Sequence, residues 1–382
     1  MSSHNANRFY ESLGVKKIIN AGSWITVYGG SIMPPAVVQT MEEASNWFVD
    51  MHELNEKAGQ FIADITGAEA GLVTAGSAAG MVLEAAACIT GLDPAKAWSL
   101  PDTTGMKDEI IIQHAHRVNY DHNFRAAGAS LIEIGNTGST EEWELESSIN
   151  ENTAAVAHIF GPRQDGAIPL PRVVKIAHDN GIPVIVDAAA MLPPPENLRR
   201  FIAEGADMVS FSGGKGVLVP QSTGILCGKR ELIEAAYLSS APNSTGIGRS
   251  AKVCKEEIAG LMTALKLFID ADHESIAANW RSKSLHVVSS LDGIAGLKVQ
   301  LIEADYDALD SDLNYASAEI TFLKEWSGPT RDEVVQALIS GNPSIRVGVG
   351  DSFRPSIWII PVNVRDGEEE FIVSRLKEVM KV

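Results

Sequence analysis

The chain of 382 residues has few cysteines and no long apolar run. Its three cysteines are Cys88, Cys227 and Cys254. Thiols this few and this scattered exclude a disulfide scaffold and a zinc cluster, and they fit a reducing compartment such as the cytoplasm. No uninterrupted apolar run reaches the ~18 residues of a membrane span, and no basic patch followed by an apolar stretch opens the sequence. We therefore expect a cytoplasmic protein that is neither exported by a conventional signal nor anchored.

Positive charge is also in the minority. Lysine and arginine number 31 against 49 aspartates and glutamates, which gives a net charge of −18. This charge repels the phosphates of nucleic acids and anionic lipid surfaces, so we expect neither as a partner. What the chain does have is an ordinary globular composition, 45% apolar and 21% charged, which excludes fibrous and disordered classes. The length suggests two domains, or one large domain with a smaller appendage.

Short apolar runs alternate with helical stretches from about residue 70 onward. These runs predict strands at 71–76, 109–113, 130–135, 154–161, 182–187, 207–213 and 223–228. Such alternation predicts an α/β fold with a mostly parallel sheet and helices on both faces. Ligands of such sheets collect beyond the carboxyl ends of the strands. The residues that end these runs are therefore the candidates for chemistry.

The regions around these strands indicate the domain organisation. Glycine and turn formers at 19–35 predict an extended or looping arm, and the apolar periodicity of 34–67 predicts a helix ending at Gly67. A second long helical pattern covers 255–291, and strand-like and helical pieces alternate after residue 293. We expect an N-terminal arm and helix start at 1–45, a large α/β domain at 46–275 and a small α+β domain at 276–382.

Asp187 and Lys215 follow neighbouring predicted strands. Asp187 closes the buried run 182–187, and Lys215 lies in the glycine-rich turn SGGKG after the next run. Taken singly, the aspartate is typical of a helix cap and the lysine of a solvated surface residue. Together they supply what pyridoxal phosphate requires: an amine for the Schiff base and a carboxylate that keeps the pyridine nitrogen protonated. The pair therefore predicts a pyridoxal-phosphate site.

The turn between the first of these strands and an alanine-rich helix is a candidate phosphate site. Gly76, Ser77 and Ala78 lie where the helix begins, and backbone N–H groups at a helix start interact favourably with an anion. Small residues at such a turn also serve close packing, so the loop alone is a weak signal. Ser212, shortly before Lys215, offers a hydroxyl donor to the same phosphate.

Several segments in a fixed order carry a family resemblance. They are INAGS, TGAEAGLVTAGSAAG, DEIIIQHAHRVNYDHNFR, VIVDAAA, ADMVSFSGGKGVLVPQSTGILCGKRELI and GRSAKVCKEEIAGLMTAL. With them the chain resembles the selenocysteine synthase-like family of pyridoxal-phosphate enzymes from about residue 18 to residue 275. The resemblance implies the aspartate aminotransferase-like fold, fold type I, with 46–275 as the cofactor-binding domain. It also implies Lys215 as the Schiff-base residue and Asp187 as the partner of the pyridine nitrogen.

The resemblance implies further cofactor residues. Fold type I enzymes usually place a residue from the segment around QHAHRVNYDHNFR over the ring face, and His116 is the first candidate, with His114 and Tyr120 behind it. The same segment reads equally well as a polar loop that never touches the cofactor. Gln221 and Thr223 follow the lysine and are candidates for the cofactor phosphate or for a dimer interface.

Basic residues are the candidates for binding substrate. Arg249 and Lys252 match two basic residues that face an anionic group in the selenium transferase of this family; a solvated helix start is the alternative. A C-terminal-domain arginine often grips the substrate carboxylate in fold type I enzymes, and the sequence does not decide between Arg346 and Arg354. Tyr120 is a further candidate for substrate contact.

Three departures from the selenium transferase pattern favour a small-molecule substrate. Gly214 stands where that enzyme has an acidic residue, and His114 stands where it has an arginine. The sequence also begins close to INAGS, without the N-terminal tRNA-binding extension. Together with the net charge of −18, these departures point toward the ammonia-lyase side of the family and away from tRNA.

We therefore expect a pyridoxal-phosphate lyase that forms a homodimer or a larger homo-oligomer and holds no metal. It would eliminate water and ammonia from a small hydroxylated amino acid or amino-sugar acid and yield a 2-oxo acid. Lys215 would be both anchor and base, with a pKa lowered by desolvation. The alternatives are a racemase or epimerase, a retro-aldol lyase, a seryl-tRNA selenium transferase, and a scaffold that has lost its cofactor.

Overall fold

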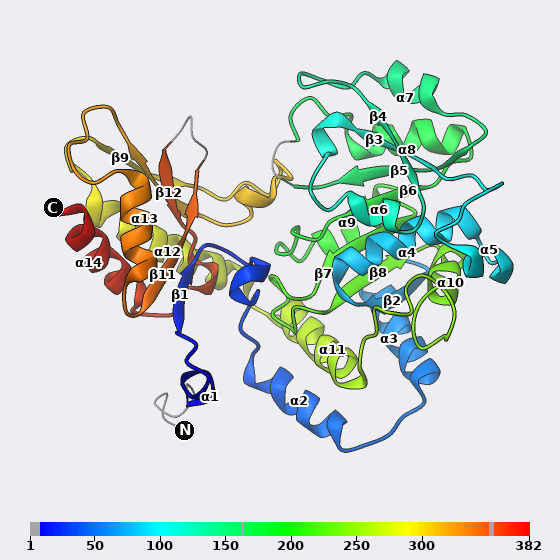
Figure 1. The fold of residues 1–382 in the computed structure, drawn as a ribbon, viewed down its shortest axis with the longest axis horizontal. Helices are drawn as coiled ribbons and strands as arrows, with labels where there is room; N and C mark the ends of the chain where they lie inside the picture. Colours follow the sequence, from blue (N-terminus) through cyan, green and yellow to red (C-terminus); the bar gives the residue numbers. More distant parts are fainter. Residues whose placement is uncertain (1–7, 162–163, 351–354) are drawn as a thin grey trace. The chain divides into compact units, whose positions relative to one another are not determined.

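The computed structural model describes residues 8–161, 164–350 and 355–382 (Figure 1). The chain forms two compact units. The larger one comprises the described parts of Ser31–Ala271 and Tyr306–Asn314, and the smaller one those of Met1–Gly30, Asp272–Asp305 and Tyr315–Val382. Neither unit is continuous in sequence, because the chain leaves each one and returns to it. Among the described residues, no helix combines the length and apolarity needed to cross a membrane.

A seven-stranded sheet lies at the centre of the larger unit. Within the described residues its order is β2-β8-β7-β6-β5-β3-β4. The strands are Ala70–Thr74 (β2), Glu109–Gln113 (β3), Ser130–Ile134 (β4), Thr153–Ile159 (β5), Val184–Asp187 (β6), Met208–Ser212 (β7) and Gly224–Gly228 (β8). β8 is antiparallel to β2 and β7, whereas the other neighbours are parallel. Each run predicted as a strand forms one, so the predicted, mostly parallel sheet is confirmed.

Helices cover both faces of this sheet. In β6, Val184 and Val186 pack into one core with residues of α3, α8, α9 and α11, whereas Ile185 packs into a second core with residues of α4, α6 and α10. The helices are Met51–Thr66 (α3), Gly76–Thr90 (α4), His122–Ala126 (α6), Leu170–Asp179 (α8), Asn197–Ala203 (α9), Arg230–Leu238 (α10) and Lys255–Asp270 (α11). Apolar side chains on both sides of a strand require this double cover, which confirms the predicted layers.

Both long helices predicted from periodicity are broken, so their predicted lengths are wrong. The first pattern forms α2 (Pro35–Ser45) and α3, and the second forms α11 and α12 (His273–Leu291). An aspartate precedes the second helix in each case. The Asp50 carboxylate accepts hydrogen bonds from the His52 and Glu53 N–H groups, and that of Asp272 accepts one from the Ser275 N–H. Such N-caps stabilise a new helix start in place of a continuous helix.

The smaller unit is built on a five-stranded sheet whose order, within the described residues, is β1-β11-β12-β10-β9. These strands are Ile18–Ala21 (β1), Leu297–Ile302 (β9), Ser317–Phe322 (β10), Ser344–Val349 (β11) and Ser356–Ile359 (β12). β1, which lies in the predicted arm, is parallel to β11, and the other neighbours are antiparallel. Residues of α12, α13 (Arg331–Ser340) and α14 (Glu368–Met380) complete its core. The strands and helices predicted beyond residue 293 are confirmed.

Candidate active site

Strand ends bring several predicted site residues to one edge of the larger sheet. Asp187 is the last residue of β6, and Lys215 lies in the turn after β7. Gly224, the first residue of β8, pairs with Thr74 at the end of β2 and with Ser212 at the end of β7. Because α4 begins directly after β2, its start lies at the same edge as Ser212. Parallel sheets bind ligands at this edge.

Burial shifts Asp187 and Lys215 toward their neutral forms. Asp187 is 5% exposed, and its carboxylate accepts a hydrogen bond from the Ala189 N–H at 2.9 Å. Burial raises the pKa of Asp187, while the Ala189 hydrogen bond and the Lys215 charge oppose the rise. Burial also lowers the pKa of Lys215, against the opposing effect of Asp187. The two side chains therefore interact electrostatically, and Lys215 holds more of the neutral, nucleophilic amine than a solvated lysine.

Two glycines allow the turn around Lys215 to pack closely against neighbouring backbone. A Cβ at Gly214 would lie 2.3 Å from the Gln221 Cα, and a Cβ at Gly216 would lie 2.4 Å from the Leu192 carbonyl oxygen. Side-chain atoms do not come this close to backbone atoms, so both positions require glycine. The side chain of Gln221 is exposed. Gly214, one of the departures from the selenium transferase pattern, thus has a packing reason in this chain.

The start of α4 offers backbone donors to an anion. Ala75 occupies the N-cap position, and its methyl side chain cannot accept the N–H groups of the first turn. Gly76 has a φ of +75°, the left-handed conformation that favours glycine. A Cβ at Gly224 would lie 2.4 Å from the Gly76 carbonyl carbon, so β8 approaches this turn closely. The predicted phosphate residues Ser77 and Ala78 follow in the first turn of the helix.

His116 is buried against a second histidine. It ends the short 3₁₀ helix η3 (His114–His116) after β3 and is 1% exposed. Its Nε2 atom is 3.2 Å from Gln164 Oε1, and its ring centroid is 4.2 Å from that of His158 in β5. Burial lowers the pKa of His116 to about 4, although the Gln164 hydrogen bond opposes this. The ring is therefore neutral near pH 7.

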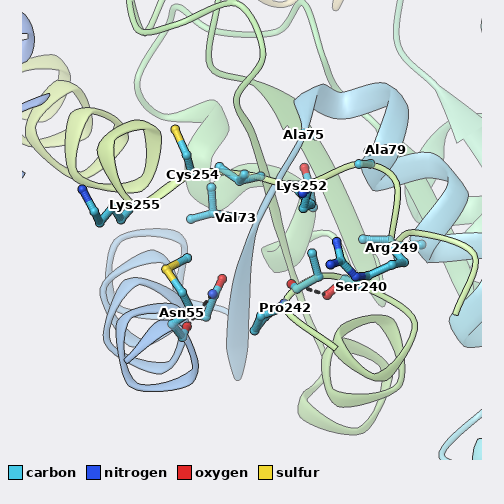
Figure 2. A pocket seen from close by; sticks show the side chains of 16 residues that line it. Asn55, Val73, Ala75, Ala79, Ser240, Pro242, Arg249, Lys252, Cys254 and Lys255 are labelled. Carbon is cyan, nitrogen blue, oxygen red and sulfur yellow. Dashed lines mark hydrogen bonds between the residues drawn. The ribbon is translucent and has the colours of Figure 1, made fainter. Parts of the chain in front are cut away.

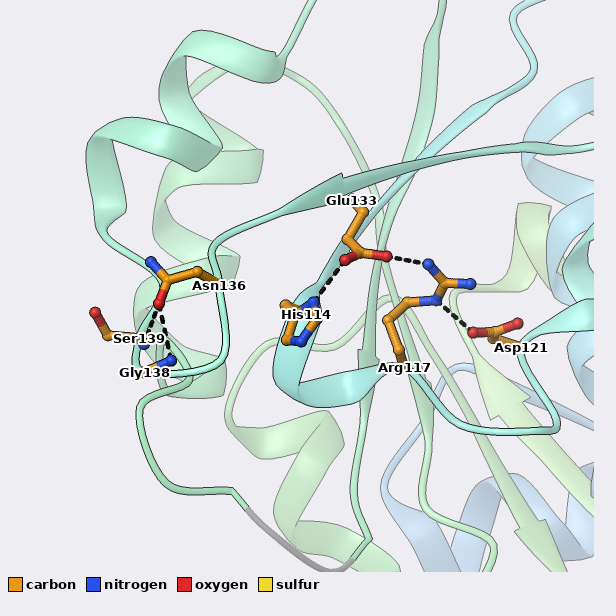
Figure 3. A network of polar contacts seen from close by, with 7 residues as sticks. All are labelled: His114, Arg117, Asp121, Glu133, Asn136, Gly138 and Ser139. Carbon is orange, nitrogen blue, oxygen red and sulfur yellow. Dashed lines mark hydrogen bonds and ion pairs between the residues drawn. The ribbon is translucent and has the colours of Figure 1, made fainter.

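His114 and Tyr120, the predicted alternatives to His116, have different surroundings. His114 Nδ1 is 2.6 Å from Glu133 Oε1, and Arg117 contacts both Glu133 and Asp121 (Figure 3). The hydrogen bond with His114, together with Arg117, lowers the pKa of Glu133. Tyr120 is 61% exposed. His114 therefore belongs to a polar network that is partly open to solvent, whereas His116 lies in the interior.

Arg249 and Lys252 line a pocket beside the start of α4. The pocket has a volume of about 350 Å³ and includes Ala75 in its lining (Figure 2). Neither basic side chain has a hydrogen bond or ion pair with any residue that the structure describes. Asp187 and Lys215 do not line this pocket. Two unpaired cations next to uncapped N–H groups favour the binding of an anion there.

Of the two C-terminal arginines, the structure describes Arg346. Arg346 lies on β11 in the smaller unit, with its guanidinium carbon 5.8 Å from the centroid of the Tyr28 ring. Its Nε atom is buried without a hydrogen-bond partner among the described residues. Arg354 lies outside the described residues. Substrate contact by either arginine stays a prediction.

Sequence reasoning missed polar groups beside the site. The Ser210 hydroxyl, on β7 in register with Asp187, donates to Glu84 Oε1 at 2.8 Å, and Glu84 is fully buried on α4. Burial raises the pKa of Glu84 well above its ordinary range; the Ser210 hydrogen bond opposes this and the Asp187 charge adds to it. Gln164, beyond the end of β5, contacts His116. The sequence signal for Glu84 is an acid within an otherwise apolar helix. The signal for Gln164 is a polar residue shortly after a strand.

Comparisons relate the chain to several known enzymes. The family model of L-seryl-tRNA selenium transferase matches residues 33–280. D-Glucosaminate-6-phosphate ammonia lyase of Salmonella typhimurium (strain 14028s / SGSC 2262) is 31% identical over 376 residues, 97% of each chain. A solved structure of a D-glucosaminate-6-phosphate ammonia-lyase matches with a TM-score of 0.84 at 31% identity, covering 98% of this chain and 99% of that chain. A 5′-C-glycyluridine monooxygenase-decarboxylase of a Streptomyces species is 30% identical over 383 residues, 97% of this chain and 92% of the relative.

A more distant structure shares the fold. A solved structure of SPT with PLP matches with a TM-score of 0.61 at 16% identity, covering 96% of this chain and 87% of that chain. This likeness concerns the fold alone, which is fold type I. The family model matches more than half of the chain, and the relatives are similar over nearly all of it. The chain therefore belongs to the L-seryl-tRNA selenium transferase family.

Proposed function

We propose that the chain is a pyridoxal-phosphate-dependent lyase that converts a small hydroxylated amino acid or amino-sugar acid into a 2-oxo acid and ammonia. The observation that carries this proposal is the position of Asp187 at the end of β6 and of Lys215 in the turn after the neighbouring strand β7, at the edge of the sheet where α4 begins. The similarity to a protein named D-glucosaminate-6-phosphate ammonia lyase supports the reaction class.

The residues at this edge fit the polar groups of the cofactor. The uncapped start of α4, at Gly76–Ala78, would hold the phosphate, with Ser212 as a hydroxyl donor. Asp187 would hold the pyridine nitrogen, the Lys215 amine would form the covalent link, and His116 would lie over the ring. The Asp187 side chain is buried, and a buried carboxylate is stabilised by a cationic or hydrogen-bond-donating partner. A protonated pyridine nitrogen is such a partner. Bound there, the cofactor supplies an electron sink for the charge left at the substrate Cα.

Lys215 is the base in this proposal. Because its pKa lies below the ordinary value, more of its amine is neutral near pH 7, and a neutral amine can take the proton from the substrate Cα. The protonated pyridine nitrogen would stabilise the negative charge of Asp187, which burial alone disfavours. Loss of the β-hydroxyl as water then gives an enamine, which hydrolyses to the 2-oxo acid and ammonia.

Arg249 and Lys252 are the proposed anion subsite for the substrate. Both side chains are unpaired within the described residues, and they line the same pocket. A phosphate or carboxylate group on the substrate would pair with them. The family resemblance extends the proposal to cofactor contact by Gln221 and to substrate contact by Tyr120, Arg346 and Arg354.

The proposed assembly is a homodimer or larger homo-oligomer in the cytoplasm. The turn between α2 and α3 exposes Trp47 and Phe48, which are 73% and 102% exposed. Large apolar side chains in such positions are typical of surfaces that another protein covers. The net charge of −18 disfavours nucleic acids and anionic membranes as partners.

The test is a substrate panel given to the purified protein with pyridoxal phosphate. The panel contains hydroxylated D- and L-amino acids and phosphorylated amino-sugar acids, and ammonia and 2-oxo acid are both measured. We expect one or more compounds to release the two products in equal amounts. Lys215→Ala should abolish the release, whereas Lys175→Ala, which changes an exposed lysine on α8, should retain it.

Other products would contradict the elimination. An amino acid of inverted configuration would assign a racemase or epimerase, and an aldehyde would assign a retro-aldol lyase. Carbon dioxide release with oxygen consumption would assign the chemistry named for the 30% identical relative. Binding of tRNA that weakens steeply with salt would favour the selenium transferase reaction.

A further inference from the structure

Gln164 is held in one orientation at the end of β5. Its Nε2 atom donates to the carbonyl oxygens of Ile159 at 3.3 Å and Gly161 at 3.1 Å. The opposite orientation of the carboxamide would place its oxygen against two carbonyl oxygens, so the hydrogen-bond network assigns nitrogen to this side. Ile159 is also in register with Asp187 across β5 and β6. The Gln164 carboxamide is therefore anchored at the sheet edge that carries the candidate site.

This anchoring determines which nitrogen of His116 carries a proton. The Gln164 oxygen faces His116 Nε2 at 3.2 Å. Because a carboxamide oxygen only accepts hydrogen bonds, Nε2 must be the donor and must carry hydrogen. A neutral imidazole has one N–H, so Nδ1 is then an unprotonated acceptor. Nδ1 is buried and has no hydrogen-bond partner among the described residues.

The surroundings favour the neutral ring. His158, from β5, packs against His116 with an angle of 65° between the ring planes, and its Nδ1 is likewise buried without a partner in the described part of the chain. Two imidazolium rings in such contact would repel each other in a medium that solvates charge poorly. Burial lowers the pKa of both histidines. A buried nitrogen lone pair without a donor is costly unless a ligand supplies the donor.

We propose that Gln164 is a positioning residue that holds His116 as the neutral Nε2–H tautomer, so that Nδ1 accepts a hydrogen bond from a hydroxyl or ammonium group of a bound ligand. His116 then acts as an acceptor and not as the acid that protonates a leaving hydroxyl. The identity of the ligand as a hydroxylated amine rests on the proposed function. The tautomer and the role of Gln164 rest on the hydrogen bonds of Gln164 and on the burial of His116 against His158.

The test reads the tautomer directly in the protein without cofactor. Protein labelled with ¹⁵N-histidine is studied by long-range ¹H–¹⁵N spectroscopy, and His116→Asn assigns the signals. We expect a pyrrole-type Nε2 and a pyridine-type Nδ1 for His116, constant from about pH 6 to about pH 8. A protonated Nδ1, or a ring that titrates within this range, would overturn the proposal.

Two substitutions test whether Gln164 causes this state. Gln164→Met removes the acceptor, so the separation between the two ¹⁵N shifts should shrink as both tautomers become populated. Gln164→Glu places a carboxylate at the same nitrogen, so the midpoint of the His116 titration should rise by about one pH unit or more. Unchanged His116 signals in both variants would overturn the positioning role.

Controls keep this test separate from folding and from the proposed function. Gln60→Met changes an exposed glutamine on α3 and should leave the His116 signals unchanged. If Gln164→Met unfolds, as judged by circular dichroism, the wild-type tautomer and the Gln164→Glu titration decide the proposal. Because the spectra need neither pyridoxal phosphate nor turnover, a failed substrate panel would contradict the proposed function and leave this result intact.

Discussion

Asp187 and Lys215 are residues whose placement at one edge of the sheet can be predicted from local sequence. A carboxylate that ends an apolar run and a lysine in a glycine turn after the next run are local signals, and the sheet brings such strand ends to one edge. The contact between His116 and Gln164 is different, because 48 positions separate them and their meeting depends on the pairing of β3 with β5. The hydrogen bond between Ser210 and the buried Glu84 likewise depends on how α4 packs against β7.

At the residue scale, Asp187→Asn should reduce activity and stabilise the protein without cofactor. An amide cannot hold the pyridine nitrogen protonated, so we expect kcat to fall by about 100-fold or more. The pKa of Asp187 is raised on folding, so its contribution to stability is full below its unfolded pKa and is lost as pH rises. At pH 7 the variant without cofactor should therefore melt at a higher temperature than the wild type. Unchanged kcat together with a lower melting temperature would contradict this account.

At the element scale, strands were easier to predict than helix ends. Strands such as β5 are short runs in which every residue is buried, so their apolar character marks them directly. The periodicity of an amphipathic helix continues across a capping residue, so the sequence pattern does not indicate the breaks at Asp50 and Asp272. The antiparallel direction of β8 also follows from pairing with β2 and β7, which an apolar run does not encode.

The contact of α4 with β7 gives a prediction at this scale. The pKa of Glu84 is raised, so its contribution to the free energy of unfolding is full below about pH 4.5 and is lost as pH increases above that value. Glu84→Gln keeps an acceptor for the Ser210 hydroxyl and cannot ionise. The variant should match the wild type near pH 4 and exceed its stability by about 1 kcal/mol or more near pH 8.

Urea unfolding at a series of pH values measures this difference. The matched control is Glu56→Gln, because the Glu56 side chain is 75% exposed on α3 and should not alter the pH dependence. If Glu84→Gln and the wild type lose stability in parallel as pH rises, the raised pKa of the Glu84 carboxyl group is contradicted.

At the scale of the whole molecule, the topology depends on pairings between distant segments. The pairing of β1 with β11 joins the predicted arm to the C-terminal part of the chain, and no local pattern in either segment indicates this partner. The charge distribution is more readily interpreted. In a chain with a net charge of −18, two cations in one pocket that have no partner in the described part of the chain, Arg249 and Lys252, favour the proposed anion subsite.

The most direct measurement of the central claim is the site at which the protein binds pyridoxal phosphate covalently. The protein with cofactor is reduced with borohydride, digested and analysed by mass spectrometry, alongside Lys215→Ala and the exposed-lysine control Lys175→Ala. The account predicts a visible absorption band before reduction and a stable pyridoxyl group on Lys215, retained in Lys175→Ala and absent from Lys215→Ala. A protein that stays colourless and unlabelled, or one labelled at another lysine, would contradict the account.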